Sequence, residues 1–441
     1  MQTASSRALV LLTAASLCLA ADGRDGTVIT RWPYGKRAAL SLTFDDGSIN
    51  QFRVAAPLLN RQGLPATFFV ITGDIPGSPH RGRFLGRPTE DIVRETATVR
   101  TDEDNLFERA SAIGHLGYAG ALEYHTRAGA LYEQGQIEEA CRTIDEGYAK
   151  VRAGAFPRQQ GPGGFEGAGD FVTWEELATL ARQGHEIASH TITHPRLAVL
   201  DEPNLAYELE KSRQDILDHL GQKHTFSVEC PYGTEDERVV RHALARYPAS
   251  RNRMPAGYLE ELNRSSDADP GASAREYVQW QRGPLTGTPM PLMKSWIDAV
   301  AALDKVWLVL VFHGVDGVGW EPKTGAELEE YFAYVRSREE SVWVATFQDV
   351  AKYVRERQNA SVRTAREGER IQVALAHDLD GSLYDLPLTL ETEVPAEWTA
   401  VEVRQGSRVQ RVDAVGRGRR ATARYQAVPN AGTVTLANAP R

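Results

Sequence analysis

Short apolar runs alternate with amphipathic stretches from about Trp32 to Arg355, which is the pattern of repeated strand–helix units. The runs are apolar on both faces, as the strands of a parallel sheet covered by helices require. The predicted strands are Ala38–Phe44, Ala66–Ile71, His185–Ser189, Thr225–Cys230, Val306–Phe312 and Ser341–Phe347. Predicted helices between them include Thr173–Arg182 and Asn204–Leu220, the second of which ends at Gly221. The pattern therefore predicts an α/β fold with a barrel-like parallel sheet.

A long insertion, residues 74–170, interrupts this rhythm. Its two ends are rich in glycine and proline, which predicts loops. Its centre has helical periodicity over Ala121–Glu133 and Ile137–Val151, with a turn at Gly135. This hairpin resembles one tetratricopeptide unit, but a solenoid needs about three, so we interpret it as a helical ornament. Because it follows a predicted strand at its C-terminal end, where barrel enzymes carry their sites, we expect it to wall off part of a cleft. The alternative is an insertion packed on the barrel side, far from any site.

The pattern changes to alternation of apolar and polar residues near Arg357. Short runs of this kind, separated by Asp-Gly, Pro and Gly turns, continue to Arg441 and predict strands. We therefore expect a barrel in residues 22–357 and a small all-β, sandwich-like accessory domain in residues 358–441.

Residues 1–21 have the pattern of a secretory signal peptide, because Arg7 precedes a short apolar run that ends in small residues. The alternative is a buried N-terminal helix. No later segment reaches the roughly 18 apolar residues of a spanning helix. The sequence therefore predicts a secreted or periplasmic protein without a membrane span. After cleavage of the signal peptide, the remaining cysteines would be Cys141 and Cys230. We expect them to be two buried free thiols rather than a disulfide.

Composition excludes several classes of protein. The 441 residues are 25% charged and 42% hydrophobic, which is ordinary for a globular chain with two or three domains. The net charge is −9, from 50 basic and 59 acidic residues. Nucleic acid and anionic membrane surfaces both require a basic face, so neither is the expected partner.

Two adjacent carboxylates, Asp45 and Asp46, follow the predicted strand Ala38–Phe44. Like charges this close raise the pKa of one of them. A metal ion would relieve the repulsion and leave the other carboxylate available as a base. Asp-Asp-Gly taken alone is more often a turn.

His190 and His194 follow the predicted strand His185–Ser189. Histidines four residues apart lie on one face of a helical turn and can reach the same divalent cation. Together with Asp46 they would form a set of two histidines and one carboxylate, which suits catalytic zinc or another divalent transition metal. The alternative is a pair of surface histidines.

His313 ends the apolar run Val306–Phe312. A histidine in this position is usually a core residue whose ring nitrogens are hydrogen-bonded. If the strand instead points into the same barrel mouth, His313 is placed to protonate a leaving group.

These features together resemble the polysaccharide deacetylase family, the NodB-homology carbohydrate esterases of carbohydrate esterase family four. The four family motifs occur in order as Thr43-Phe44-Asp45-Asp46, His190-Thr191-Ile192-Thr193-His194, Pro231-Tyr232-Gly233 and Val311-Phe312-His313. The resemblance covers roughly residues 32–355. It implies a distorted (β/α) barrel that hydrolyses acetyl groups, mostly N-acetyl groups on sugars.

The resemblance also implies a role for each motif residue. Asp45 would be the general base and His313 the general acid, and the backbone N–H of Tyr232 would help to hold the oxyanion. Asp46, His190 and His194 would bind a divalent metal, zinc in our prediction, with cobalt, nickel or manganese as alternatives.

The chain departs from the family pattern at the arginine that commonly orients the base, because Glu229 stands at that position. Arg251, at the next predicted strand, could substitute for it, although such an arginine is more often part of a structural ion pair. The gap between Asp46 and His190 is also longer than is usual in the family, because of the insertion.

Three hypotheses follow. The first is a secreted, metal-dependent deacetylase of an acetylated glycan, with N-acetylgalactosamine or N-acetylglucosamine at a chain end as the expected substrate. The second is an O-acetyl esterase of the xylan-deacetylating kind. The third is a carbohydrate-binding protein with a decayed site, which only Glu229 supports.

Overall fold

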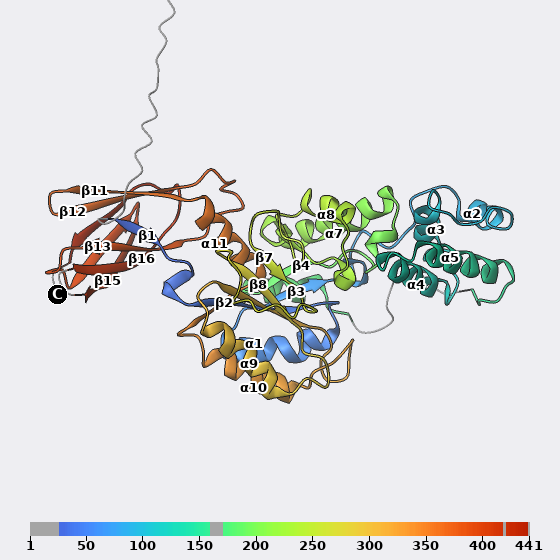
Figure 1. Ribbon diagram of the computed structural model, residues 1–441, viewed down its shortest axis with the longest axis horizontal. Coiled ribbons are helices and arrows are strands. Elements are labelled where there is room, and N and C mark those ends of the chain that lie inside the picture. Colours follow the sequence, from blue (N-terminus) through green and yellow to red (C-terminus); the bar gives the residue numbers. More distant parts are fainter. Residues whose placement is uncertain (1–25, 159–170, 418–419, 440–441) are drawn as a thin grey trace, which may run out of the picture.

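The computed structural model describes residues 26–158, 171–417 and 420–439. The molecule is elongated, with a β domain at one end, a sheet-and-helix body in the centre and the helices of the insertion at the other end (Figure 1). The predicted signal peptide lies outside the described residues. Within them, no helix combines the length and apolar character that crossing a membrane demands.

The central body contains a sheet of nine parallel strands, an open and distorted barrel as the sequence predicted. The strand order is β6-β5-β4-β3-β2-β9-β8-β7, and β10 pairs with the start of β2. The bounds are β2 Ala38–Phe44, β3 Thr67–Val70, β4 Glu186–Ser189, β5 Ser227–Val228, β6 Ala249–Ser250, β7 Glu260–Leu262, β8 Val278–Arg282, β9 Val306–Phe312 and β10 Val342–Val344. The carboxyl ends of β2, β4, β5 and β9 therefore lie at one edge, which is the edge that carries the motifs.

Three strands of this sheet, β6, β7 and β8, were missing from the predicted set, although Arg251 was expected to follow a strand at the position of β6. They have two, three and five residues, and their polar residues interrupt the apolar runs on which the prediction relied. Phe347 was also misassigned, because it begins a helix rather than ending a strand.

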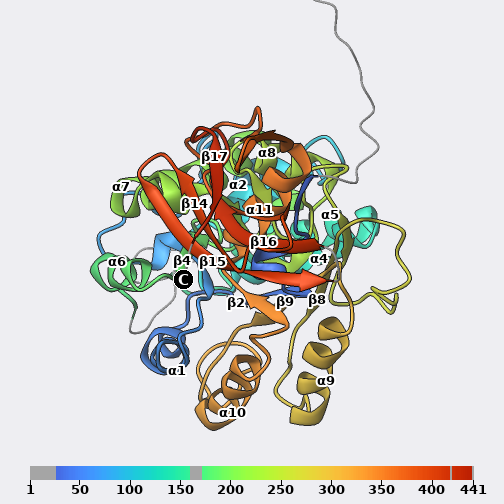
Figure 2. The ribbon, with the colours of Figure 1, turned by 90° about the vertical axis from the view of Figure 1, so that its left-hand side faces the viewer.

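Helices cover both faces of the sheet, with α1, α9 and α10 on one side and α7 and α8 on the other (Figures 1 and 2). The bounds are α1 Ala56–Gln62, α6 Trp174–Arg182, α7 Glu202–Leu220, α8 Glu237–Leu244, α9 Met290–Ala301, α10 Gly325–Arg336 and α11 Phe347–Asn359. Thr173 and Thr324 cap α6 and α10 through capping boxes, which fixes where these two helices begin.

The insertion forms four helices, α2 Thr89–Glu95, α3 Leu106–Ile113, α4 Ala121–Glu133 and α5 Ile137–Arg152. The α4–α5 hairpin matches the predicted one. The helices share an apolar core of their own, and Val199 of the central body joins it. The insertion is therefore anchored to the barrel through packed side chains.

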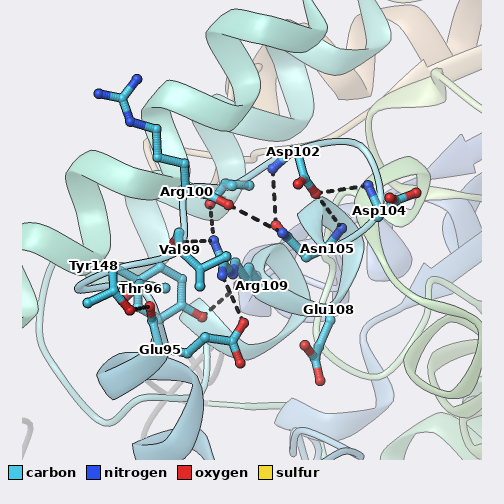
Figure 3. Close-up of polar contacts among 12 residues, drawn as sticks. Glu95, Thr96, Val99, Arg100, Asp102, Asp104, Asn105, Glu108, Arg109 and Tyr148 are labelled. Carbon is cyan, nitrogen blue, oxygen red and sulfur yellow. Dashed lines mark hydrogen bonds and ion pairs between the residues drawn. The ribbon is translucent and has the colours of Figure 1, made fainter.

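A buried arginine stabilises the insertion internally (Figure 3). The Arg109 side chain, on α3, is fully buried and pairs with Glu95 at 2.9 Å between Nη2 and Oε1. Its Nη1 donates to the Val99 carbonyl at 3.2 Å and to Thr101 Oγ1 at 2.9 Å. Tyr148 of α5 donates to the Arg109 carbonyl at 2.9 Å. These bonds tie the loop after α2 to α3 and α5, so we expect the insertion to keep its shape.

The C-terminal domain is an eight-stranded antiparallel sheet folded over one apolar core, in the order β1-β13-β16-β15-β14-β17-β12-β11. The bounds are β1 Thr27–Ile29, β11 Ser361–Glu367, β12 Arg370–Ala376, β13 Leu388–Val394, β14 Ala400–Gln405, β15 Arg408–Arg417, β16 Arg420–Ala427 and β17 Val434–Asn438. The first half of β15 pairs with β14 and the second half with β16, so this strand passes from one layer to the other.

The N-terminal strand differs from the expected domain boundary. Residues 27–29, which the sequence analysis placed in the barrel, pair with β13 of the C-terminal domain. Thr27 N also donates to Thr364 Oγ1 at 3.2 Å. A three-residue strand has no periodicity of its own, so only the pairing shows where it belongs. Cys141 and Cys230, predicted as free thiols, are both buried and unpaired.

Candidate active site

The two histidines and Asp46 converge at the carboxyl edge of the sheet. Asp46 Oδ1 lies 3.5 Å from His190 Nε2 and 3.3 Å from His194 Nε2. One ligand atom from each of the three residues falls within 4.8 Å of the others. Among the residues that the structure describes, this is the group of histidine, cysteine and acidic side chains able to hold a metal ion. The donor set and its spacing fit a divalent metal such as zinc.

The histidines do not lie on a helical turn, so that part of the prediction is wrong. Thr191 and His194 have φ values of 68° and 57°, in the left-handed region. The buried Glu208 carboxylate accepts the backbone N–H groups of Ile192 and Thr193, each at 2.9 Å. These bonds fold the segment into a tight loop, and the loop brings His194 to Asp46 beside His190.

A hydrogen bond fixes the orientation of His190. Its Nδ1 donates to the Glu229 carbonyl at 2.8 Å, which leaves Nε2 with a free lone pair on the side of Asp46. Metal-binding histidines commonly have such a partner, because it sets the tautomer and the ring direction. Glu229 thus supports the metal site through its main chain.

Asp45 is held by Arg251, which follows β6. Arg251 Nη1 and Nη2 contact the two oxygens of Asp45 at 2.9 and 2.5 Å, and Nη1 also donates to Thr43 Oγ1 at 2.7 Å. Both side chains of the ion pair are almost fully buried. Burial raises the pKa of Asp45, but the charges of Arg251, His313 and His190 and the hydrogen bond from Arg251 together outweigh it, so the pKa of this carboxyl lies below its usual range.

Glu229 shares the same arginine. Its Oε2 lies 3.0 Å from Arg251 Nε, so the two groups form an ion pair. Neither of these two atoms forms a hydrogen bond among the described residues. Asn252 donates to the other oxygen, Oε1, at 2.9 Å. Burial raises the pKa of Glu229 despite the neighbouring arginine. Since Asp45 takes the bidentate contact, we assign the ionised carboxylate to Asp45.

His313, at the end of β9, lies on the opposite side of Asp45 from Arg251's strand. Its Nε2 is 3.5 Å from Asp45 Oδ2, and its ring packs edge-on against Trp320 with centroids 4.6 Å apart. Burial lowers the pKa of His313. The side chain is 12% exposed, so one edge of the ring reaches the cavity.

Tyr232 lies on the far side of the metal triad from His313. Its φ of 69° turns the chain sharply after Pro231, and its ring packs against His194 with centroids 4.8 Å apart. The Arg196 guanidinium lies over the Tyr232 ring, with its Cζ 3.9 Å from the ring centroid, and forms an ion pair with Glu133 of α4. The insertion therefore contacts the site through Glu133, Arg196 and Tyr232.

One cavity of about 640 Å³ is lined by the candidate site residues Asp45, Asp46, His190, His194, Tyr232 and His313. Ala130, Glu133 and Gln134 of the insertion form part of its wall, so the alternative of an ornament far from the site is wrong. Sequence reasoning missed Glu133, Arg196, Arg264 and Trp320 as cavity residues. Only Trp320 had a local signal, since it follows His313 by seven residues in a Gly-rich loop.

Comparison with known proteins agrees with this geometry. The family model described as polysaccharide deacetylase matches residues 32–97 and 136–248, which contain three of the four motifs and skip the centre of the insertion. These two segments of the chain are therefore similar to the polysaccharide deacetylase family.

Individual relatives are distant. A curated gellan lyase from Bacillus sp is 26% identical over 278 residues, a match that spans 58% of this chain and 11% of that protein. A protein from Mycobacterium smegmatis assigned to the polysaccharide deacetylases is 16% identical with a TM-score of 0.38, covering 78% of this chain and 98% of that one. A family 4 carbohydrate esterase from Bacillus anthracis is also 16% identical, with a TM-score of 0.32 and coverages of 72% and 83%.

Proposed function

We propose that the protein is a secreted or periplasmic, metal-dependent deacetylase that removes N-acetyl groups from amino sugars of a glycan. The match of residues 32–97 and 136–248 to the polysaccharide deacetylase model supports hydrolysis of an acetyl group. The observation that carries the finer proposal is the grouping of Asp46, His190 and His194 beside an Arg251-held Asp45 in one cavity.

Asp46, His190 and His194 would hold the metal, and zinc is our candidate because two imidazoles and one carboxylate are donors that it accepts. A bound divalent ion supplies Lewis acidity, which activates water near neutral pH and polarises the acetyl carbonyl. Glu229 keeps Nε2 of His190 available for this ion.

Asp45 would act as the general base. Its two oxygens are fixed by Arg251, and the lowered pKa keeps the carboxylate ionised and able to accept a proton. Arg251 stands in for the arginine that the family has at the position of Glu229. The proposal of a decayed site rested on that missing arginine, so it loses its support.

His313 and Tyr232 would act on the two ends of the scissile bond. His313 lies beside Asp45 and lines the cavity, where it would donate a proton to the leaving amine. The backbone N–H of Tyr232 would donate to the developing oxyanion on the other side of the metal triad.

The test is acetate release by purified protein. We expect release from N-acetylated chitin oligomers or from glycans that end in N-acetylgalactosamine or N-acetylglucosamine, with loss after chelation and recovery with zinc, cobalt, nickel or manganese. Peptidoglycan and acetylxylan are the comparison substrates. Faster release from acetylxylan would favour the O-acetyl esterase, and absence of both bound metal and acetate release would contradict the proposal.

A further inference from the structure

The catalytic cavity continues into a second groove of about 530 Å³. Arg264 and Trp320 line both hollows, so the two are adjacent along one surface. The groove is further lined by Leu285, Leu292 and Trp296 among others. It lies on the His313 side of the metal triad, because Trp320 packs against His313, whereas the insertion closes the Tyr232 side.

The groove exposes large apolar side chains next to polar ones. Trp320, Leu285 and Leu292 are 53%, 46% and 47% exposed. Ser265, Ser266 and Asp267 share the lining. Exposed apolar groups gathered in one place mark binding surfaces, and an aromatic face edged by polar groups suits a sugar ring, which is apolar on its faces and polar around its rim.

The groove is built on fixed loops. The buried Lys323 ammonium donates to the carbonyls of Thr286 and Thr288 at 3.2 and 3.1 Å and pairs with Glu327 at 2.7 Å. This joins the loop that carries Trp320 to the loop that carries Leu285. On the other wall, Arg282 donates to the Ser266 carbonyl through both terminal nitrogens, each at 3.2 Å. Fixed loops lose little entropy when a ligand binds.

One cation of the groove is free. Among the described residues, the Arg264 guanidinium has neither an ion pair nor a side-chain hydrogen bond, and it lies where the groove meets the catalytic cavity. Such a group can donate to the hydroxyl, ring or carbonyl oxygens of a sugar that spans the two hollows.

We propose that this groove binds the sugar residues next to the one that is deacetylated, so that a glycan enters with its end against α4 and its continuing chain over Trp320 toward Leu292. The occupant is an unbranched oligosaccharide of acetylated amino sugars. This inference rests on the proposed function and adds the direction in which the glycan lies. Glu133 and Arg196 close one side of the catalytic cavity, whereas the other side opens into the groove.

The experiment measures kcat/KM for N-acetylated oligosaccharides of one to four residues, with the zinc-loaded protein. We expect kcat/KM to rise about tenfold from one residue to three. The paired variant Leu285→Asn/Leu292→Asn should lose most of that rise, because both exposed side chains line the groove and neither lines the catalytic cavity. Val409→Asn, at a position 48% exposed on the β domain, is the matched control and should keep it. Mass spectrometry of the tetrasaccharide product should place the first free amine on a terminal residue.

Calorimetric binding of the same oligosaccharides separates the two proposals. If acetate is released but kcat/KM does not depend on chain length, or the paired variant behaves like Val409→Asn, the groove proposal is wrong while the proposed function stands. If internal residues lose acetyl groups first, the direction is wrong. If no substrate releases acetate but affinity still rises with length and falls in the paired variant, the proposed function fails and the groove proposal holds.

Discussion

Arg251 contacts both carboxylate oxygens of Asp45, at 2.9 and 2.5 Å, although 206 residues separate the two in the chain. The sheet makes this possible, because Asp45 follows β2 and Arg251 follows β6, and both strands end at the same edge. The cation that holds Asp45 therefore comes from the strand next to β5, and the end of β5 carries Glu229.

Replacing Arg251 should impair catalysis more than metal binding. Arg251→Lys keeps the charge but not the two-pronged contact, so we expect kcat to fall by about 10- to 100-fold with the metal still bound. Arg251→Ala leaves Asp45 and Glu229 buried without their cation and should cost about 3–5 kcal/mol of stability. Adding Glu229→Arg to Arg251→Ala should restore part of kcat. Unchanged kcat in Arg251→Lys and Arg251→Ala would show that Asp45 needs no orienting cation.

Asp45 and the metal ligands should respond differently to substitution. Asp45→Asn should abolish turnover while bound zinc stays near one equivalent, because an amide keeps the shape of the carboxylate but cannot take a proton. His190→Ala and His194→Ala should lose zinc and activity together, since two protein ligands hold zinc poorly. Elemental analysis beside acetate release checks both. Normal rates with Asp45→Asn would remove its role as base.

His313→Ala should slow the cleavage of an amide more than that of an activated acetyl ester. General acid catalysis typically contributes about 10²–10⁴-fold, and a good leaving group hardly needs it. The comparison uses an N-acetylated oligosaccharide and an acetyl ester of a nitrophenol. Equal losses on the two substrates would indicate that His313 only supports the structure.

The insertion should act on substrate binding through Glu133. Glu133→Gln weakens the ion pair that holds Arg196 on Tyr232, so we expect KM for the oligosaccharide to rise about tenfold with little change in kcat. Glu123→Gln is the matched control, because Glu123 is on the same helix but 67% exposed. Identical KM values for the two variants would mean that α4 only borders the cavity.

The junction between α11 and the β domain should make stability depend on pH. Burial raises the pKa of Glu356 from 4.5 to about 7, and the Leu386 N–H donates to it at 3.0 Å. A raised pKa in the folded state means that the contribution to stability is complete below pH 4.5 and is lost as the pH rises through 7. The melting temperature of the parent should therefore fall by a few degrees between pH 5 and pH 8.

Glu356→Gln should reduce that fall, whereas Glu340→Gln, at an exposed position, should leave it unchanged. Part of the fall should persist in Glu356→Gln, because burial also raises the pKa values of Glu186, Glu208, Glu235 and Glu261. His377 lies 3.5 Å from Glu356, and the charges of Asp385 and Lys352 also act on the pKa of Glu356. An equal fall in the parent and in Glu356→Gln would place the pH dependence elsewhere.

Local patterns in the sequence were enough for the strands and motifs that carry the chemistry. β9 is a seven-residue apolar run and β2 is apolar apart from Ser41 and Thr43, and buried parallel strands need such runs wherever they lie in the sheet. Asp45, Asp46, His190 and His313 follow strands directly, so the parallel order alone placed them at one edge. The α4–α5 hairpin was likewise local, since its periodicity and Gly135 belong to the same segment.

Only the tertiary structure decided which distant groups meet. The sequence offered Arg251 as a substitute for the missing arginine, but only the strand order placed it against Asp45. Residues 27–29 were assigned to the barrel, and only the pairing of β1 with β13 placed them in the β domain. Glu133 and Trp320 became cavity residues because the insertion and the loop after β9 fold toward the same edge from opposite sides. Ion pairs and strand pairings of this kind depend on distances between segments far apart in the chain, and periodicity within a segment carries no information about those distances.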